Sequence, residues 1–524
     1  MTSRYRPDPE GFADLCGRHA VVPVWREILA DAQTPVAAWL RLQPEPNGFL
    51  LESVEGGERW GRYSFLGGDA FAVVKAKDGR ITVTGEPPLR PGDGEGPLAY
   101  VKRLLGACRA PQLPGLPPLN GGAVGFIGYD CVRELEHLPA APPDDLGLPD
   151  LVLLLTRSFV VFDHFEQKAY VITNVARSSD PARAYDDAVE RCEAVIERLT
   201  APLDAPAIWV QGVRSPGYEA TVDDEEFADM VQRCREHIFA GDAFQVVPSR
   251  RFEAPMAGSS FGAYRVLRTI NPSPYMYFLR FGAADDHPAF EIAGSSPEPL
   301  VRVIEDRVVA RPIAGTRSRG ADEAADLALE QELLADDKER AEHVMLVDLA
   351  RNDIGRVAEY GSVAVDELMT VERYSHVMHI VSSVSGRLRD PAGAFDALTA
   401  AFPAGTVSGA PKVRAMEIID SLEKTRRGPY AGVVGYFSFS GNLDTCITIR
   451  TIVATGGRAY VQAGAGIVAD SIPGQEAEET RRKAEALLSA VAGAVSLELE
   501  VPSGTDDAEL PSSGAAKRAG PQSS

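Results

Sequence analysis

The stretch Gly432-Val-Val-Gly-Tyr-Phe-Ser-Phe439, with its continuation to Ala469, decides the fold class of this chain. A turn at Ser440-Gly-Asn442 follows it, then a strand over Asp444–Thr455, a Gly456-Gly457 turn and a strand over Arg458–Ala469. Short apolar runs between Gly- and Asn-containing turns are typical of an antiparallel meander. Elsewhere hairpins alternate with helices, but strand–helix–strand units do not repeat. The sequence therefore predicts an α+β fold of antiparallel sheets, rather than a doubly wound one.

The same patterns predict the elements on either side of the meander. Strands are expected at 49–53, 62–66, 70–76, 80–84, 121–130, twice within 151–173, at 244–252 and within 290–314. Helices are expected at about 181–199, 223–240, 322–353 (with a break near Ala335), 391–401 and 474–492. Residues 200–217, with three prolines and two glycines, predict a linker between an N-terminal region, 1–199, and a second region, 218–501. The Ser-, Gly-, Pro- and Ala-rich tail 502–524 is predicted to be disordered.

Composition excludes several classes of protein. The chain has 524 residues and a net charge of −22, which argues against general binding to nucleic acid or to an anionic membrane. An anionic substrate needs only a locally basic pocket and stays possible. No apolar run approaches the roughly 20 residues that span a bilayer, and the N-terminus lacks the apolar core of a signal peptide. Six scattered cysteines without a CxxC pair fit a reduced cytoplasm.

One predicted helix carries the first candidate for chemistry, Asp336-Asp-Lys-Glu-Arg-Ala-Glu-His-Val-Met-Leu-Val-Asp-Leu-Ala-Arg-Asn-Asp353. It contains no Gly or Pro, and its opening aspartates suit the positive helix start. Apolar residues recur at helical spacing and mark its expected buried face: Ala341, Met345 and Leu349. Glu342 lies beside this face, so its carboxylate is expected to point inward or into a cleft. Because an unpaired buried carboxylate is costly, either a base or a metal must meet it.

The last predicted helix carries the second candidate. Glu476, Glu479, Lys483 and Leu487 share one stripe, which describes either a surface Glu–Lys pair or part of a site. Gly464 and Gly466, just before this helix, indicate close approach by a ligand. Arg450 lies in an otherwise apolar run, and an anionic ligand would explain an arginine at that position. Carboxylates without Cys or His spacing suit Mg²⁺. These residues predict an Mg²⁺-bridged carboxylate substrate, with Arg450, Lys483 and glycine N–H groups as anion receptors.

Three further features are candidates on the sequence alone. His379 begins an apolar run and is either structural or catalytic. Glu298, in Gly294-Ser-Ser-Pro-Glu298, lies at a turn and would be a general acid if burial raised its pKa. Gly405–Lys412 resembles an anion-binding loop that enters a helix, but it lacks the spacing of a nucleotide-binding P-loop.

With these residues in hand, the chain resembles the chorismate-utilising enzymes and, among them, the large subunits (component I) of anthranilate synthases. The matching segments run in family order: Leu50–Ser53, Phe244–Arg250, Asn271–Met276, Gly294–Glu298, Pro312–Arg317, Lys338–Asp353, Arg373–His379, Gly405–Met416, Tyr430–Tyr436, Asp444–Thr451 and Gln462–Lys483.

The resemblance implies packed antiparallel sheets surrounded by helices, with the site in the cleft between the sheets. It implies that chorismate and ammonia give 2-amino-2-deoxyisochorismate, which loses pyruvate to leave anthranilate, the first step of tryptophan biosynthesis. By motif position it assigns these roles: Glu342 and Glu479, with Glu476 nearby, to Mg²⁺; Tyr430, Arg450, Gly464, Gly466 and Lys483 to substrate carboxylates; Thr406 to the pocket wall; Glu298 to general acid catalysis at the C4 hydroxyl; and His379 to pyruvate elimination.

Two positions separate this chain from relatives with other chemistry. Water-adding members of the family have a lysine base where this chain has Gln245, and an amide cannot deprotonate water. Aminodeoxychorismate synthases typically have a lysine where this chain has Ala314, so the covalent intermediate of those enzymes cannot form. The resemblance therefore favours an anthranilate synthase. Since the chain shows no GxCxG-type segment, its ammonia is expected from a separate glutamine amidotransferase subunit, which predicts a hetero-oligomer.

The resemblance also implies feedback inhibition by L-tryptophan. The residues that match the family's allosteric tryptophan site are Leu51, Glu52, Ser53, Pro274, Tyr275 and Met276. Glu52 is expected to pair with the ammonium group of tryptophan, and Ser53 to help fix it. Two rival functions stay open at this point: an enzyme that stops at the amino intermediate, and an inactive chorismate- or tryptophan-binding regulator.

Overall fold

The computed structural model describes residues 4–53, 61–203, 217–256, 258–374, 377–389 and 393–499. Most of the predicted linker 200–217 and the whole tail 502–524 lie outside the described residues. The α-helices are α1 (Pro9–Arg18), α2 (Pro35–Leu42), α3 (Pro97–Ala107), α4 (Pro181–Thr200), α5 (Asp224–Phe239), α6 (Ser260–Ile270), α7 (Glu323–Ala335), α8 (Asp337–Gly355), α9 (Ala394–Ala401), α10 (Lys412–Leu422) and α11 (Pro473–Leu499), with 3-10 turns η2 (Tyr129–Glu134) and η3 (Gly405–Val407).

The strands are β1 (Val21–Leu29), β2 (Gly48–Glu52), β3 (Tyr63–Lys77), β4 (Arg80–Gly85), β5 (Gly122–Ile127), β6 (Leu151–Asp163), β7 (Lys168–Ala176), β8 (Glu219–Ala220), β9 (Gln245–Val246), β10 (Ser249–Pro255), β11 (Tyr275–Phe281), β12 (Phe290–Ser296), β13 (Pro299–Ile304), β14 (Arg307–Ala310), β15 (Ile313–Ser318), β16 (Ala364–Arg373), β17 (Val377–Arg387), β18 (Gly409–Ala410), β19 (Val433–Ser438), β20 (Leu443–Ile447), β21 (Thr451–Thr455) and β22 (Arg458–Gly464). Every strand pairing among the described residues is antiparallel, so the predicted fold class is confirmed.

The strands form two layers that share their longest members. One layer runs β8-β10-β22-β21-β12-β11-β2-β3-β6-β7-β1, and the other runs β4-β3-β6-β5-β19-β20-β13-β14-β17, with β15 and β16 also on β17. Both β3 and β6 pass from one layer into the other, and the β3–β6 register shifts between Gly67 and Ala72, where the strands bend.

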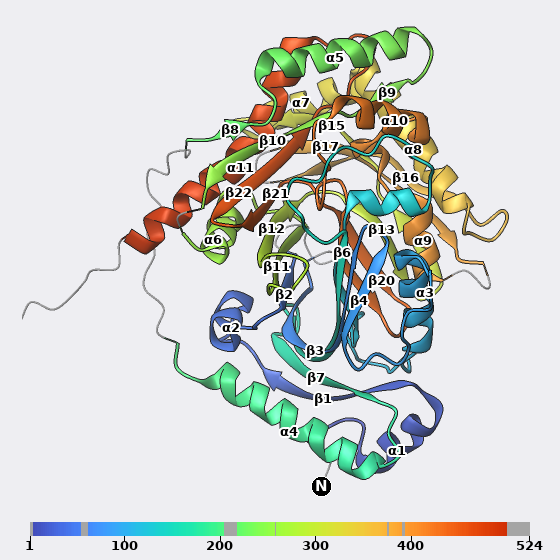
Figure 1. The fold of residues 1–524 in the computed structure, drawn as a ribbon, viewed down its shortest axis with the longest axis vertical. Helices are drawn as coiled ribbons and strands as arrows, with labels where there is room; N and C mark the ends of the chain where they lie inside the picture. Colours follow the sequence, from blue (N-terminus) through green and yellow to red (C-terminus); the bar gives the residue numbers. More distant parts are fainter. Residues whose placement is uncertain are drawn as a thin grey trace, which may run out of the picture.

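Aromatic side chains fill the space between the two layers. Phe126 on β5 contacts Phe281 on β11 and Phe290 on β12, with ring centroids 5.7 and 5.9 Å apart. The outer faces are covered by helices: α2, α4, α6 and α11 on the first layer and α3, α8 and α9 on the second. Figure 1 shows α1 and α4 beside β1 and β7 at the lower end and α5 at the upper end. The arrangement is helix, sheet, sheet, helix.

The N-terminal region builds these sheets together with the second region. β2 pairs with β11 (Leu51 opposite Tyr277), and β5 pairs with β19 (Gly125 opposite Gly435). The predicted linker therefore joins two lengths of chain that share both sheets and all three of the larger hydrophobic clusters.

Two details of the predicted elements are wrong. The middle strand expected over Asp444–Thr455 is broken into β20 and β21, because β20 pairs with β13 in one layer and β21 with β12 in the other. On α8 the expected stripe Ala341, Met345 and Leu349 is exposed or half-buried; the buried face instead holds His343, Leu346, Val347, Ala350, Asp353 and Ile354. The break expected near Ala335 is confirmed, since Asp336 caps α8 through the N–H groups of Lys338 and Glu339.

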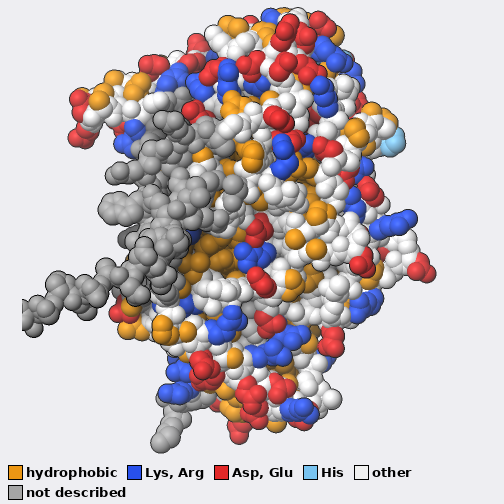
Figure 2. Space-filling model, turned by 60° about the vertical axis from the view of Figure 1, so that its left-hand side comes forward, with side chains coloured by type: hydrophobic (Ala, Val, Ile, Leu, Met, Phe, Trp, Pro, Cys, Tyr) orange, Lys and Arg blue, Asp and Glu red, His pale blue; other side chains and the backbone are white. Residues whose placement is uncertain are grey.

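The surface mixes charges of both signs. On the face in Figure 2, Lys and Arg side chains lie interspersed with Asp and Glu side chains. All six cysteines are buried and free of disulfides. Among the described helices, none combines the length and the apolar character needed to cross a bilayer.

Candidate active site

Glu298 and Arg450 lie at two crossings, which are short connections between strands of different sheet layers. Glu298 joins β12 to β13, and Arg450 joins β20 to β21. The crossings bond to each other: the Ser295 N–H donates to Arg450 O (3.0 Å) and the Ile447 N–H to Glu298 O (3.0 Å). Arg450 has φ +50°, a left-handed conformation that a non-glycine residue seldom adopts. The opening between the diverging sheets is where functional side chains can gather.

A cleft of about 710 Å³ occupies this opening. It brings together every residue that the sequence predicted for catalysis, substrate binding or metal binding: Glu298, Glu342, His379, Thr406, Tyr430, Arg450, Gly464, Gly466, Glu476, Glu479 and Lys483. They come from α8, α11, β17, β22, η3, the two crossings, and the loops before β19 (Tyr430) and after β22 (Gly466). Residues distant in sequence therefore form one continuous wall.

Glu298 has the properties of a general acid. Burial raises the pKa of its carboxyl to about 7, and the hydrogen bond from Thr406 and the positive charge of Lys483 offset only part of that effect. Thr406 Oγ1 donates to Glu298 Oε1 at 2.9 Å. A carboxyl group with this pKa is about half protonated at neutral pH, so it can donate a proton there.

His379 has the properties of a base. Burial lowers the pKa of its imidazole, which keeps the ring neutral at pH 7. Its Nδ1 lies 3.2 Å from the Gly315 carbonyl oxygen and 3.0 Å from Thr316 Oγ1. Because a carbonyl oxygen can only accept a hydrogen bond, we assign the ring proton to Nδ1. The lone pair of Nε2 is then left to accept a proton.

Cationic groups line one side of the cleft. Burial lowers the pKa of the Arg450 guanidinium, while the charge of Glu479 opposes this shift. Lys483 Nζ donates to the Gly464 carbonyl (3.0 Å) and pairs with Glu479 (2.6 Å). The Glu–Lys stripe of α11 is thus an i,i+4 pair and also part of the cleft wall, so both sequence interpretations describe it.

The two glycines permit close approach of neighbouring side chains. A Cβ on Gly464 would lie 2.9 Å from the Tyr430 hydroxyl, and a Cβ on Gly466 would lie 2.8 Å from Gln245 Nε2. Gln245 is buried; its Nε2 donates to Glu342 Oε1 at 3.3 Å, and its Oε1 has no hydrogen-bond partner. An amide with an unused acceptor therefore faces the cleft beside Glu342.

The carboxylates of α8 and α11 fit a hard divalent cation. Five glutamates line the cleft (Glu298, Glu339, Glu342, Glu476 and Glu479) against four bases (Lys338, Arg450, Arg482 and Lys483). Burial and then the charge of Glu339 raise the pKa of Glu342, and Glu479 adds to the effect; burial and then Glu479 raise the pKa of Glu476. Within the described residues no three acidic, His or Cys side chains form a closed metal cage. Oxygen donors with room for further ligands are the surroundings that Mg²⁺ prefers.

A second pocket, of about 330 Å³, holds the residues predicted for tryptophan. Leu51, Glu52, Ser53, Pro274, Tyr275 and Met276 all line it. The Glu52 carboxylate accepts hydrogen bonds from Tyr264 (2.5 Å) and Arg268 (both 3.1 Å) on α6, and its pairing with the ammonium group of tryptophan stays a prediction. Successive side chains of a strand point to opposite faces of the sheet. The sequence of β2 alone does not show which of its two faces lies against α6.

Sequence reasoning missed several residues of both sites. In the second pocket, Asp444 is a half-buried carboxylate whose pKa is raised by desolvation; it accepts a hydrogen bond from the Tyr275 hydroxyl at 2.9 Å and pairs with Arg302 at 3.4 Å. In the cleft, Thr316 and Gln462 lie two residues from Ala314 and Gly464. Side chains two residues apart on a regular strand share a face, and that alternation is the signal that would have found Gln462. The register of β15 shifts between Ala314 and Thr316, so alternation gave no such signal for Thr316.

Comparison with known proteins places the chain in a family. Residues 68–489 match the family described as chorismate binding enzyme. "Anthranilate synthase component 1" of Mycolicibacterium smegmatis is 48% identical over 493 residues, 93% of this chain and 94% of that protein. The protein of the same name from Pseudomonas aeruginosa is 49% identical over 481 residues, covering 90% and 95% of the two chains.

Solved structures give the same result. The crystal structure of anthranilate synthase component I from Streptococcus pneumoniae superposes with a TM-score of 0.73 at 38% identity, over 88% of this chain and 99% of that one. MenF, the menaquinone-specific isochorismate synthase of Escherichia coli, shares the fold at 21% identity, with a TM-score of 0.67 over 92% of this chain and 98% of its own. This chain therefore belongs to the chorismate binding enzymes and, within them, to the anthranilate synthase component 1 proteins.

Proposed function

We propose that this chain is the large subunit of an anthranilate synthase in the tryptophan biosynthetic pathway. It aminates chorismate with ammonia to 2-amino-2-deoxyisochorismate and then eliminates pyruvate to give anthranilate. One observation carries the proposal: a carboxyl with a pKa of about 7 (Glu298) and a neutral imidazole (His379) line the same cleft as Arg450 and Lys483. An acid, a base and two anion receptors are the groups that these two steps on a dicarboxylate require.

Each step has its own residue in this scheme. The Glu298 carboxyl donates its proton to the leaving C4 hydroxyl, which departs as water while ammonia bonds to the ring. His379 Nε2 then accepts the C2 proton, and the electrons of that C–H bond form the last double bond of the aromatic ring as the C3–O bond breaks. The departing enolpyruvate takes up a proton and becomes pyruvate. Arg450 and Tyr430 hold the enolpyruvyl carboxylate, while Lys483, Gly464 and Gly466 contribute to carboxylate binding; Thr406 holds Glu298 in place.

Mg²⁺ would be held by Glu342 and Glu479, with Glu476 nearby. The bound ion would supply charge neutralisation and Lewis acidity at the ring carboxylate of chorismate. The mutual repulsion of the glutamates on α8 and α11, which raises the pKa values of Glu342 and Glu476, supports this assignment, because a cation between the two helices would relieve it.

Two residues favour ammonia as the nucleophile. Gln245 presents an amide that cannot deprotonate water but has an acceptor for an N–H group. Ala314 lines the cleft at the position where aminodeoxychorismate synthases typically have a lysine nucleophile, so this chain has no side chain there that could form a covalent intermediate. A regulator that only binds chorismate would have no need of Glu298 and His379 in these environments.

The ammonia source is a separate glutamine amidotransferase, component II, so that the working enzyme is a hetero-oligomer. The name component 1 of the relatives implies such a partner. None of the six cysteines lines the cleft, all being buried elsewhere. Free, buried cysteines are also compatible with a reducing cytoplasm, where we place the enzyme.

We further propose that the second pocket binds L-tryptophan as a feedback inhibitor. The pocket is apolar along Leu51, Met276 and Tyr275, as an indole ring requires, and Glu52 and Asp444 are the carboxylates in its wall that an ammonium group could meet.

The proposal is tested by incubating the isolated chain with chorismate, Mg²⁺ and a high ammonium concentration, and following anthranilate fluorescence. We expect fluorescence to rise with Mg²⁺, and to stop when EDTA is added in excess. A folded chain that produces no anthranilate under these conditions would leave the regulator as the better interpretation.

A further inference from the structure

A buried ion pair lies directly behind the cleft wall and has no part in the reaction described above. Glu423 follows the last turn of α10, and Arg427 lies one turn further along the chain; their side chains are 4% and 2% exposed. Arg427 Nη2 lies 2.6 Å from Glu423 Oε1, and Nε lies 2.9 Å from Oε2, which is a two-pronged pairing. Such a pair persists in a dry interior only when its remaining donors and acceptors are satisfied.

The remaining donors of Arg427 bind the cleft wall. Its Nη1 donates to Val407 O (2.6 Å) and its Nη2 to Val247 O (2.7 Å), and both valines line the cleft. Its guanidinium carbon lies 5.6 Å from the ring centre of Tyr430 and 4.7 Å from that of Tyr129. One side chain thus contacts three lengths of chain that meet only at the site.

Glu423 connects the ion pair to a further segment of the cleft wall, Gln462–Gly464. Its Oε1 accepts hydrogen bonds from both the N–H and the hydroxyl of Ser249, each at 2.8 Å. Ser249 Oγ in turn accepts from Gln462 Nε2 at 2.8 Å, and Ser249 pairs with Gly464 between β10 and β22. Gln462 and Gly464 both line the cleft.

We propose that Arg427, neutralised by Glu423, is a positioning residue for the substrate site. It fixes Val247, Val407 and Tyr430 relative to one another and, through Glu423, the Gln462–Gly464 segment. The inference rests on the proposed function, because Tyr430 is assigned there to a substrate carboxylate. The role needs arginine, because the planar guanidinium binds one carboxylate and two carbonyl oxygens while its face lies over the Tyr430 ring. A lysine ammonium has only three donors and no planar face, so it cannot make all of these contacts.

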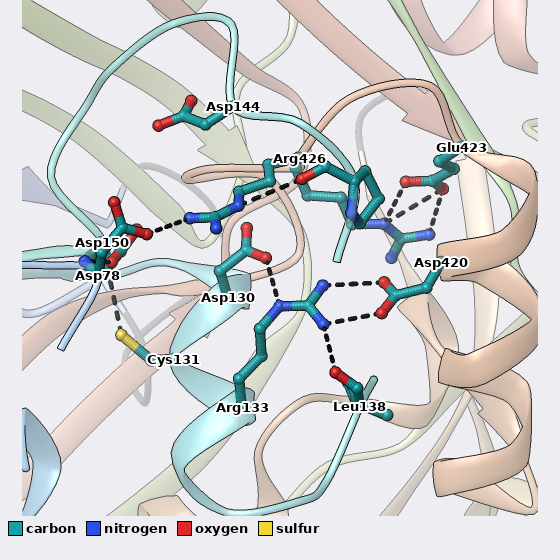
Figure 3. Close-up of polar contacts among 12 residues, drawn as sticks. Asp78, Asp130, Cys131, Arg133, Leu138, Asp144, Asp150, Asp420, Glu423 and Arg426 are labelled. Carbon is teal, nitrogen blue, oxygen red and sulfur yellow. Dashed lines mark hydrogen bonds and ion pairs between the residues drawn. The ribbon is translucent and has the colours of Figure 1, made fainter. Parts of the chain in front are cut away.

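Asp420 on α10, three residues before Glu423, forms a second ion pair that serves as a matched control. Arg133 on η2 pairs with Asp420 through Nη1 (2.7 Å) and Nη2 (2.9 Å), and its Nε donates to Asp130 at 3.0 Å (Figure 3). This pair also ties α10 to its surroundings, but none of the hydrogen-bond partners of Arg133 lines the cleft. Its loss should therefore loosen α10 without disturbing the substrate wall.

The test compares Arg427→Lys with Arg133→Lys, measuring the melting temperature, kcat and the KM for chorismate at saturating ammonium and Mg²⁺. We expect Arg427→Lys to raise KM at least tenfold with kcat within threefold, because Tyr430 binds ground and transition states alike. Arg133→Lys should lower the melting temperature to a similar degree but keep KM within twofold. A KM within twofold in Arg427→Lys, or an equal rise in both variants, would overturn the proposal.

Two further variants make the result independent of misfolding. If Arg427→Lys does not fold, the pair Arg427→Met with Glu423→Gln leaves no buried charge, and the same rise in KM is expected of it. Combined with Tyr430→Phe, Arg427→Lys should raise KM less than the product of the single effects, since both act through one ring. Independent effects would contradict the role. Wild-type turnover tests the proposed function separately; its absence would remove both.

Discussion

At the scale of single residues, the environment of each glutamate decides what it can do. Glu298 is the cleft glutamate whose pKa burial raises to about 7, with Thr406 as its hydrogen-bond donor. Glu342 and Glu476 have other carboxylates as neighbours, which raise their pKa values by repulsion in addition to burial. The first environment suits proton transfer, and the second suits a cation.

The pH dependence of the reaction tests the role of Glu298. Because a general acid must be protonated, kcat/KM for chorismate should fall as the pH rises through about 7, when free ammonia is held constant. Glu298→Gln should be slower by about 10²–10⁴-fold, and its rate should lack this fall. A wild-type rate that stays flat or rises between pH 6 and 8 would assign the proton to another group.

Ser53→Phe tests the tryptophan pocket. The larger side chain should fill part of the 330 Å³ space, so that a tryptophan concentration that abolishes wild-type activity leaves the variant mostly active. Turnover without tryptophan should stay near the wild-type value, because Ser53 does not line the cleft. Inhibition curves of the two proteins measure the effect, and identical curves would place the inhibitor elsewhere.

Single residues also show what the sequence could and could not predict. The Glu476–Glu479–Lys483 stripe was predictable because it is local to one helix. The pairing of Glu52 with Tyr264 and Arg268 depends on contacts more than 200 positions away, so no local pattern contains it. The left-handed Arg450 was not predictable either, since it arises where β20 and β21 join different layers.

At the scale of elements, α8 and α11 present carboxylates to one cleft from helices that are distant in sequence. The existence of both helices, and the break before α8, were predictable from composition and capping. The buried face of α8 was not, because it lies against β15 and β17, whose position depends on the sheet. Helix propensity fixes where a helix begins, whereas tertiary packing fixes how it is rotated.

Neutral variants of the two helices test the metal site. Glu342→Gln and Glu479→Gln should each abolish turnover at ordinary Mg²⁺ concentrations, because each removes one anionic oxygen ligand. The double variant should be scarcely worse than either single one if the two act as a unit. Mg²⁺ titrations of activity provide the measurement, with Glu478→Gln, an exposed neighbour on α11, as the control. Near-normal Mg²⁺ dependence in Glu342→Gln would remove it from the site.

At the scale of the whole molecule, the two regions of the chain are interleaved in the same sheets. β2 lies between β3 and β11, and β5 lies between β6 and β19. The sequence predicted antiparallel sheets and a linker. The order of the strands was not predictable, because no local sequence pattern shows which distant strands form hydrogen bonds with each other.

This interleaving predicts how fragments of the chain behave. A fragment of residues 218–501 alone should not fold cooperatively, because β11 and β19 each lose a neighbouring strand and the aromatic layer between the sheets is exposed. Near-UV circular dichroism and denaturant titration would show the loss of fixed packing. Co-expression with residues 1–203 should restore a soluble complex. A cooperative transition in the isolated fragment would contradict the shared core.

The central claim is that one cleft carries out both amination and pyruvate elimination. The most direct test measures chorismate, anthranilate and pyruvate in the same reaction of the isolated chain with Mg²⁺ and ammonium. The account predicts that one anthranilate and one pyruvate form for each chorismate consumed. Consumption of chorismate without pyruvate would show that the reaction stops at the amino intermediate, and would contradict the role given to His379.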